Sequence, residues 1–169
     1  EGAYVFITGR RQQQLDEAVR LLGDCASAIR ADVSDMGDLN CLVEEIRARK
    51  GRLDVLFANA GGGSLAPLGE ITEDHFDRIF DVNVRGLLFS VQKALPLMSR
   101  GGTIVLNAST AGSKGTPAFS VYSASKAAVR SLARSWALDL RDRGIRVNVV
   151  SPGLVPTAAY ELLGLSHAP

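Results

Sequence analysis

The sequence alternates between short apolar runs and longer segments in which apolar residues recur at helical spacing. Five such runs are rich in β-branched and aliphatic residues, which is typical of strands buried on both faces of a parallel sheet. The predicted strands span 3–8, 26–31, 53–58, 103–108 and 145–150. Because strand and helix alternate with short connections, the sequence predicts an α/β fold with one doubly wound, mostly parallel sheet in a single domain.

The segments between the runs carry signals for the ends of helices. Ser34 or Asp35 can cap the second predicted helix, Gly51 ends it, and Thr72 can cap the third. The predicted helices span 10–22, 35–51, 72–98 in two stretches, and 120–143.

Composition narrows the possible functions of the 169 residues. Of these, 46% are hydrophobic and 22% are charged, which suits one domain with a sizeable core, and the net charge of +1 does not favour nucleic acid or a membrane surface. Cys25 and Cys41 form no C-x-x-C pair, and His75 and His167 lie far apart, so no metal site is predicted. No apolar run approaches the roughly 18 residues of a membrane span. A reducing, cytoplasmic location is expected.

The predicted helix 120–143 places a tyrosine and a lysine on its apolar face. Tyr122 precedes Lys126 by four residues, which puts both on one side of a helix. At about 100° per residue, four further core residues fall within roughly 40° of Tyr122. They are Val129, Ala133, Trp136 and Leu140. Burial of a phenol and an ammonium is costly, so the pair is a candidate acid and base in which the lysine favours the phenolate. Alternatively, Tyr122 is a core residue with a satisfied hydroxyl and Lys126 reaches solvent.

Further candidate residues follow the predicted strands. In doubly wound sheets, ligands bind at the carboxyl ends of the strands. The residues at these ends are Gly9, Arg10, Arg11, Asp32, Val33, Asn59, Ala60, Gly61, Ser109, Pro152 and Gly153. Each residue type also has an ordinary role in turns and helix starts, but together they predict a binding site at this edge.

With these motifs, the sequence resembles the classical short-chain dehydrogenase/reductase family. The motifs are N-A-G at 59–61, N-V at 83–84, a serine at 109, Y-S-A-S-K at 122–126 and R-V-N-V-V-S-P-G at 146–153. The resemblance covers nearly the whole chain. It implies a Rossmann-like domain over 1–169 and an oxidoreductase, such as a carbonyl reductase, that transfers a hydride between a nicotinamide cofactor and a ketone or secondary alcohol.

The resemblance also implies a role for each matching residue. Tyr122 would be the general acid and base, and Lys126 would bind the nicotinamide ribose and favour the phenolate. Ser109 would hold the substrate oxygen, and Asn83 would support a proton-relay water. The implied cofactor contacts are Arg10, Arg11, Asp32, Val33, Asn59, Ala60, Gly61, Tyr122, Lys126, Pro152, Gly153 and Val155.

The end of the first predicted strand indicates which cofactor is used. Domains of this type that prefer NAD carry an acidic residue there, which binds the ribose 2′-hydroxyl. This chain has Gly9, Arg10 and Arg11 instead, and a guanidinium can pair with a 2′-phosphate. NADP(H) is therefore predicted over NAD(H).

The sequence departs from the family pattern at both ends. The family's phosphate-binding turn, T-G-x-x-x-G-x-G, is not among the 169 residues, and the run 3–8 resembles the family's second strand. We therefore expect a chain truncated at both ends, with unpaired strand edges. A non-enzymatic fragment or pseudoenzyme, serving as an oligomerisation or interaction module, is the alternative. A sugar-nucleotide epimerase also uses Y-x-x-x-K, but the motifs at 59–61 and 146–153 suit the classical group better.

The side of helix 120–143 opposite Tyr122 consists mostly of small residues. They are Ala124, Ala127, Ala128, Ser131, Ser135 and Leu138. Small residues allow close helix packing, so a homo-oligomer, a dimer or tetramer, is expected; alternatively the face is simply exposed, since alanine favours helix. The substrate pocket is expected to include 110–119 and residues after Thr157, without a diagnostic charge pattern.

Overall fold

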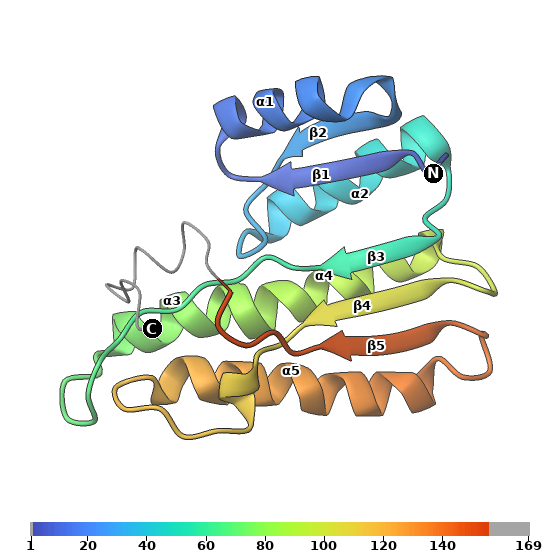
Figure 1. Ribbon diagram of the computed structural model, residues 1–169. Coiled ribbons are helices and arrows are strands. Elements are labelled where there is room, and N and C mark those ends of the chain that lie inside the picture. The colour runs from blue at the N-terminus through green and yellow to red at the C-terminus, as the bar shows by residue number, and fades with distance from the viewer. Residues whose placement is uncertain (1, 156–169) are drawn as a thin grey trace.

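Five parallel strands form two sheets in the computed structural model, which describes residues 2–155 (Figure 1). Strand β1 (Val5–Gly9) pairs with β2 (Ala26–Arg30). The second sheet has the order β3 (Val55–Ala58), β4 (Thr103–Asn107), β5 (Arg146–Val150). The parallel α/β architecture is confirmed. The strands do not form one sheet because β1 and β3, within the described residues, are not hydrogen-bonded to each other.

The helices follow the predicted order. They are α1 (Gln12–Leu22), α2 (Met36–Lys50), α3 (Glu73–Phe80), a π-helical turn (Asp81–Gly86), α4 (Leu87–Ala94) and α5 (Ser120–Asp139), with 3₁₀ turns at Gly23–Cys25, Leu95–Leu97 and Thr110–Gly112. Asp35 caps α2 by accepting a hydrogen bond from the Asp38 N–H, and Thr72 caps α3 through the His75 N–H. The predicted end of α5 at residue 143 is wrong, because a turn closed by Gly144, at φ 66°, already leads into β5.

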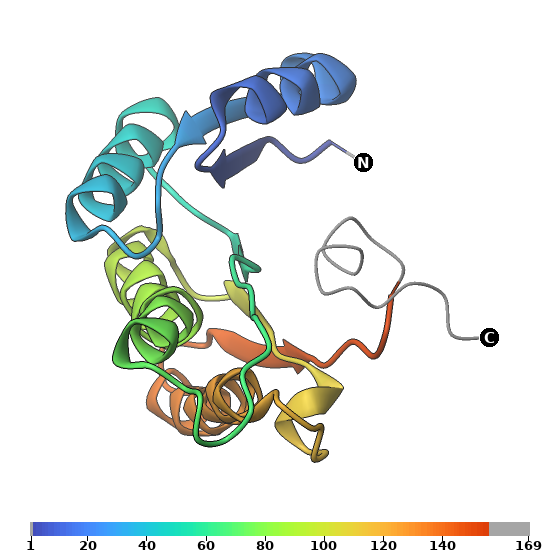
Figure 2. The same cartoon turned by 90° about the vertical axis from the view of Figure 1, so that its left-hand side faces the viewer.

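The helices are distributed unevenly over the two sheets. Figure 2 shows α2, α4 and α5 on one side of the strands and α1 on the other side of β1 and β2. No helix among residues 2–155 covers the second face of β3, β4 and β5. On that face Val55 and Phe57 are 59% and 55% exposed. None of the described helices is both long and apolar enough to cross a membrane.

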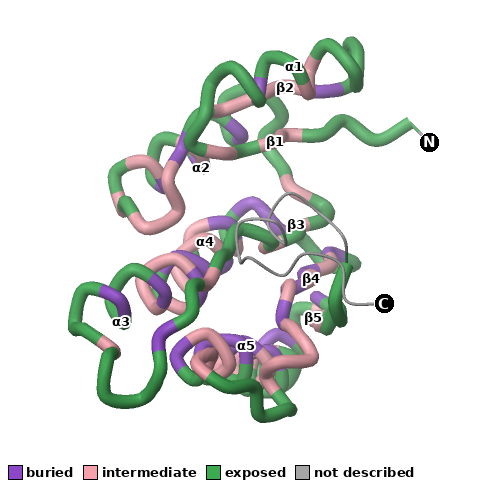
Figure 3. The backbone as a smooth tube through the Cα atoms, turned by 60° about the vertical axis from the view of Figure 1, so that its left-hand side comes forward, coloured by how far each residue is buried: buried purple, intermediate pink, exposed green. Residues whose placement is uncertain are grey.

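The main core lies where α4 and α5 pack on β4, as the buried segments in Figure 3 show. Ile104, Leu106 and Val129 are fully buried there. The predicted apolar stripe of α5 is confirmed, since Val129, Ala133 and Leu140 are buried and Trp136 packs against them. This packing fixes the face of α5 that carries Tyr122 and Lys126.

The π-helical turn contacts the loop after β2, and this contact joins the two sheets. Gly86 lies so close to the loop after β2 that a Cβ atom there would be 2.7 Å from the Val33 carbonyl oxygen. The neighbouring Arg85 donates a hydrogen bond to the Ser34 carbonyl at 3.2 Å. A separate, smaller cluster of Val43, Ile46 and Leu97 packs α2 against the 3₁₀ turn after α4. The loop after β2 is therefore held against α4.

Replacement of Gly86 tests this junction. We expect Gly86→Ala to lower the free energy of unfolding by about 1–3 kcal/mol, because the added methyl group overlaps the Val33 carbonyl. Gly115→Ala is the matched control, since no atom lies within 4 Å of a Cβ at that position. Urea denaturation measures both, and equal unfolding free energies for the two variants would contradict the proposed contact.

Candidate active site

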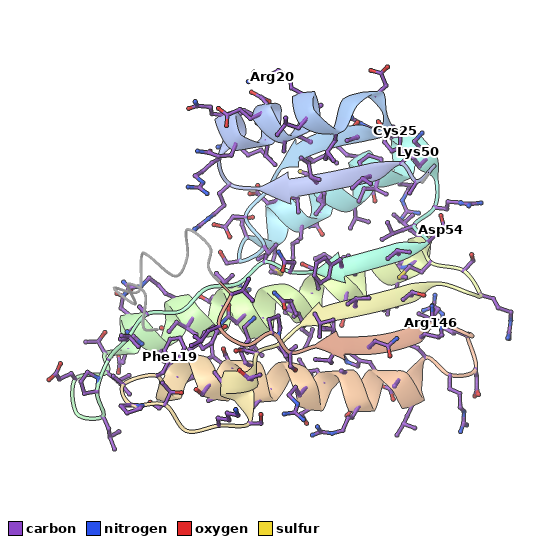
Figure 4. The ribbon with its side chains drawn as sticks, viewed as in Figure 1. Arg20, Cys25, Lys50, Asp54, Phe119 and Arg146 are labelled. Atoms are coloured by element: carbon purple, nitrogen blue, oxygen red, sulfur yellow. The ribbon has the colours of Figure 1, made fainter. Side chains whose placement is uncertain are left out.

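The carboxyl ends of all five strands lie at one edge of the molecule. Every strand arrow in Figure 1 points the same way, so the segments that follow the strands emerge on the same side. Figure 4 places Phe119 on this side, whereas Asp54 and Arg146, at the amino ends of β3 and β5, lie on the opposite side. The structure thus brings the residues predicted at the strand ends to a common edge.

Lys126 is buried on the core face of α5. The residue is 4% exposed. Its Nζ donates a hydrogen bond to the Asn107 carbonyl oxygen at 2.8 Å. The same nitrogen lies 5.7 Å from the centroid of the Tyr122 ring. Burial lowers the pKa of Lys126 to about 8. The lysine therefore does not reach solvent, and at neutral pH it is mainly a positive charge beside Tyr122.

Tyr122 is held by packing on its ring. The ring stacks on Phe119, with centroids 4.3 Å apart and an angle of 24° between the planes. Gly63 lies against it, since a Cβ there would be 2.5 Å from the Tyr122 Cδ2. Within residues 2–155 the Tyr122 hydroxyl makes no hydrogen bond, so a satisfied core hydroxyl does not describe this side chain. The ring is fixed and the hydroxyl is free to meet a ligand.

Asn83 lies in the π-helical turn and has no exposed surface. Its amide pairs with the Gly62 backbone in both directions: Oδ1 accepts from the Gly62 N–H at 3.0 Å, and Nδ2 donates to the Gly62 carbonyl at 2.8 Å. Nδ2 also donates to Ser125 Oγ at 2.9 Å. At Gly61, a Cβ would lie 3.0 Å from Asn83 Oδ1 and 3.1 Å from Lys126 Nζ. The 59–63 loop thus closes over both Asn83 and Lys126.

Ser109 follows β4 and begins the 3₁₀ turn Thr110–Gly112. Its Oγ accepts a hydrogen bond from the Ala111 N–H at 3.1 Å. The turn packs directly on α5, because a Cβ at Gly112 would lie 2.9 Å from the Ala127 nitrogen. No hydrogen bond joins Ser109 to Tyr122 in the part of the chain that the structure describes. Ser109 is therefore close to the helix that carries Tyr122, without a direct link to it.

The predicted cofactor residues near β1 and β2 form a charged group. Arg10 lies 3.7 Å from Asp32, and its side chain is 74% exposed. Burial opposes ionisation of Asp32, but hydrogen bonds from the Ser34 hydroxyl and N–H together with the charge of Arg10 lower its pKa overall. Arg11, the residue before α1, is exposed, and Val33 is half-buried. An exposed pair of this kind is weak, so Arg10 is available to an anionic ligand.

The other predicted cofactor residues lie at the ends of β3 and β5. Asn59 is exposed, and its Oδ1 accepts from Asn107 Nδ2 at 2.7 Å. The remaining positions are also exposed, and they are Ala60, Gly61, Pro152, Gly153 and Val155. Pro152 accepts a hydrogen bond from the Thr110 N–H at 3.0 Å, which ties the end of β5 to the turn after Ser109. These exposed positions and the buried Lys126 ammonium lie at the same edge of the sheets.

Several residues that shape this edge were not predicted from the sequence. Ser125, Gly63, Phe119 and Asn107 contact or orient the predicted side chains. Ser125 could have been found, because a serine three residues after Tyr122 lies near the same buried face of a helix. The expected pocket residues after Thr157 lie outside the described residues. Among residues 2–155, no group of three His, Cys, Asp or Glu side chains could hold a metal ion.

Comparisons with known proteins support a family assignment. The family model described as short chain dehydrogenase matches residues 1–164. Oxidoreductase asL5 of Sarocladium schorii is 50% identical over 167 residues, which cover 97% of this chain and 67% of that protein. Galactitol 2-dehydrogenase of Agrobacterium fabrum is 34% identical, covering 99% and 67%. A crystal structure from Brucella melitensis, described as a short-chain dehydrogenase/reductase of the glucose/ribitol dehydrogenase type, is 30% identical with a TM-score of 0.92, covering 96% and 66%.

The lowered pKa of Lys126 makes stability depend on pH. In the unfolded chain the lysine titrates near 10.5, so between about pH 8 and about pH 10.5 the unfolded state binds more protons than the folded state. The free energy of unfolding of the wild type, relative to Lys126→Met, should therefore rise through this interval by roughly 1–3 kcal/mol.

Urea denaturation at several pH values measures this difference. Lys114→Met, which removes an exposed lysine from the loop before α5, supplies the background trend. A difference between the wild type and Lys126→Met that stays constant across the interval would contradict the assigned pKa.

Proposed function

Because the chain belongs to the short-chain dehydrogenase family, we propose that it transfers a hydride between NADP(H) and a ketone or secondary alcohol, with Tyr122 as general acid and base. The observation that carries this proposal is the buried Lys126 ammonium beside Tyr122, whose hydroxyl is free among the described residues. The words oxidoreductase and dehydrogenase in the names of the relatives support the reaction class.

In this proposal each side chain acts on the substrate oxygen or on a proton. Reduction of a ketone places negative charge on its oxygen, so hydroxyl donors are needed there. Ser109 would hold this oxygen and Tyr122 would give it a proton, while the charge of Lys126 favours the phenolate that remains. The nicotinamide supplies or accepts the hydride when bound, which no side chain can do. Asn83 would support a water that returns the proton to Tyr122 through Lys126.

The cofactor would extend along the edge formed by the strand ends. Arg10 and Arg11 would bind the 2′-phosphate after β1, and Asp32 and Val33 would contact the adenine side. Asn59, Ala60 and Gly61 would support its middle, and Pro152, Gly153 and Val155 would contact the nicotinamide side, where Lys126 and Tyr122 lie. The close approach of Gly61 to Lys126 Nζ supports this order along the edge.

A homo-oligomer, a dimer or tetramer, in the cytoplasm completes the proposal. The small-residue side of α5 supports it, because five of its six residues are exposed. The five are Ala124, Ala127, Ser131, Ser135 and Leu138. Small side chains on an uncovered helix let a second helix approach closely.

Replacement of Tyr122 tests the proposed acid and base. We expect Tyr122→Phe to lower kcat by at least about 100-fold, because proton transfer by a positioned side chain contributes roughly that much or more. Tyr4→Phe is the matched control, since Tyr4 is exposed just before β1 and its hydroxyl bonds, among residues 2–155, to Ser27 alone. Nicotinamide absorbance during turnover of ketones and secondary alcohols provides the measurement. Undiminished turnover by Tyr122→Phe would remove the mechanism.

Cofactor choice is tested by the ratio of kcat/KM for NADP(H) to that for NAD(H). We expect Arg11→Ala and Arg10→Ala each to lower this ratio about tenfold, because each loses a charge-assisted hydrogen bond to the phosphate. Arg52→Ala is the control, since Arg52 pairs with Asp54 at the opposite edge. A wild type that prefers NAD(H) would refute the predicted cofactor.

A further inference from the structure

We infer that Ser125 is a positioning residue of the site, which acts with the Gly62 backbone to hold the amide of Asn83. This inference rests on the proposed function, because it concerns the geometry in which Tyr122 and Lys126 would act. Ser125 lies in α5 between these two residues in the sequence, and it is fully buried.

The hydrogen bonds of Ser125 leave its hydroxyl only one orientation. An amide NH₂ group can only donate, so Ser125 Oγ is the acceptor in its 2.9 Å bond with Asn83 Nδ2. The hydroxyl hydrogen is then directed to the Tyr122 carbonyl oxygen, 2.7 Å away. Bonding of a serine hydroxyl to a carbonyl one turn earlier is common in helices. Here it orients the remaining lone pairs toward Asn83.

Ser125 and the Gly62 backbone together fix which way the Asn83 amide points. One Nδ2 hydrogen is used by Ser125 and the other by the Gly62 carbonyl, which leaves Oδ1 for the Gly62 N–H. A rotated amide would place an oxygen against two acceptors. Ser125, Asn83 and Gly62 therefore form one hydrogen-bonded unit, which we call the loop clamp. The clamp fastens the 59–63 loop to α5 through the π-helical turn.

The loop clamp reaches Tyr122 and Lys126 through glycine contacts. Gly63 rests against the Tyr122 ring, and Gly61 lies within contact distance of Lys126 Nζ. Loss of the Ser125 hydroxyl leaves an Asn83 N–H unpaired in a site without exposed surface, which is unfavourable. The Gly62 backbone then holds the amide alone, and the hold of the loop over the two side chains weakens. The expected effect is on the chemical step, more than on substrate binding.

The first test follows the Gly62 N–H by hydrogen exchange in the whole chain. We expect Ser125→Ala to speed exchange of this amide about tenfold, and Ser125→Cys, with its weaker acceptor, to lie between Ser125→Ala and the wild type. Ser123→Ala is the matched control, because the buried Ser123 hydroxyl has no partner among the described residues. Equal Gly62 exchange in Ser125→Ala and the wild type would overturn the inference.

The second test separates positioning from simple structural support. In steady-state kinetics we expect Ser125→Ala to lower kcat roughly 10- to 100-fold while substrate KM stays within about twofold, and Ser123→Ala to leave both unchanged. Faster Gly62 exchange with unchanged kcat would overturn the role in catalysis. If the wild type transfers no hydride, the proposed function is refuted. Faster Gly62 exchange in Ser125→Ala than in the wild type would still support the loop clamp in that case.

Discussion

Asn83 is buried without exposed surface, so its amide must find every hydrogen bond inside the protein. It does so by taking the Gly62 backbone as a partner in both directions and Ser125 as a third contact. Because Asn83 belongs to the turn between α3 and α4, this one amide connects that helical segment, the loop after β3 and α5. The placement of Lys126 and Tyr122 relative to the 59–63 loop depends on these three segments remaining together.

Much of the fold could be predicted because its signals are local. Apolar runs located all five strands, and the caps at Asp35 and Thr72 located the starts of two helices. The expected unpaired strand edges are found at β1 and β3, which are not hydrogen-bonded to each other within the described residues. The end of α5 was misplaced, since the turn at Gly144 depends on backbone conformation that the helical pattern of residues does not reveal. The π-helical turn has no periodic signature at all.

In the site, too, the local motifs could be predicted and the contacts between distant segments could not. The residues taken from motifs, such as Tyr122, Lys126 and Asn83, do come to one edge of the sheets, because parallel strands deliver their ends to the same side. What the sequence could not give is the set of contacts that hold them: the Asn107 carbonyl on Lys126 and the Phe119 ring on Tyr122. Main-chain oxygens and stacked rings have no required spacing in the sequence, so only the folded chain brings them together.

Parallel pairing also has a consequence for the order in which the protein folds. Strands β1 and β2 are joined by α1 alone, and Val5 pairs with Ala26, whereas Val55 must find Thr103 across α3 and α4. Closing the longer loop costs more entropy and slows folding. We expect the β1–α1–β2 unit to form early and the Asn83 contacts to form late. Contacts made after the folding transition state slow unfolding more than they speed folding. The residues around Asn83 would then govern the lifetime of the folded protein.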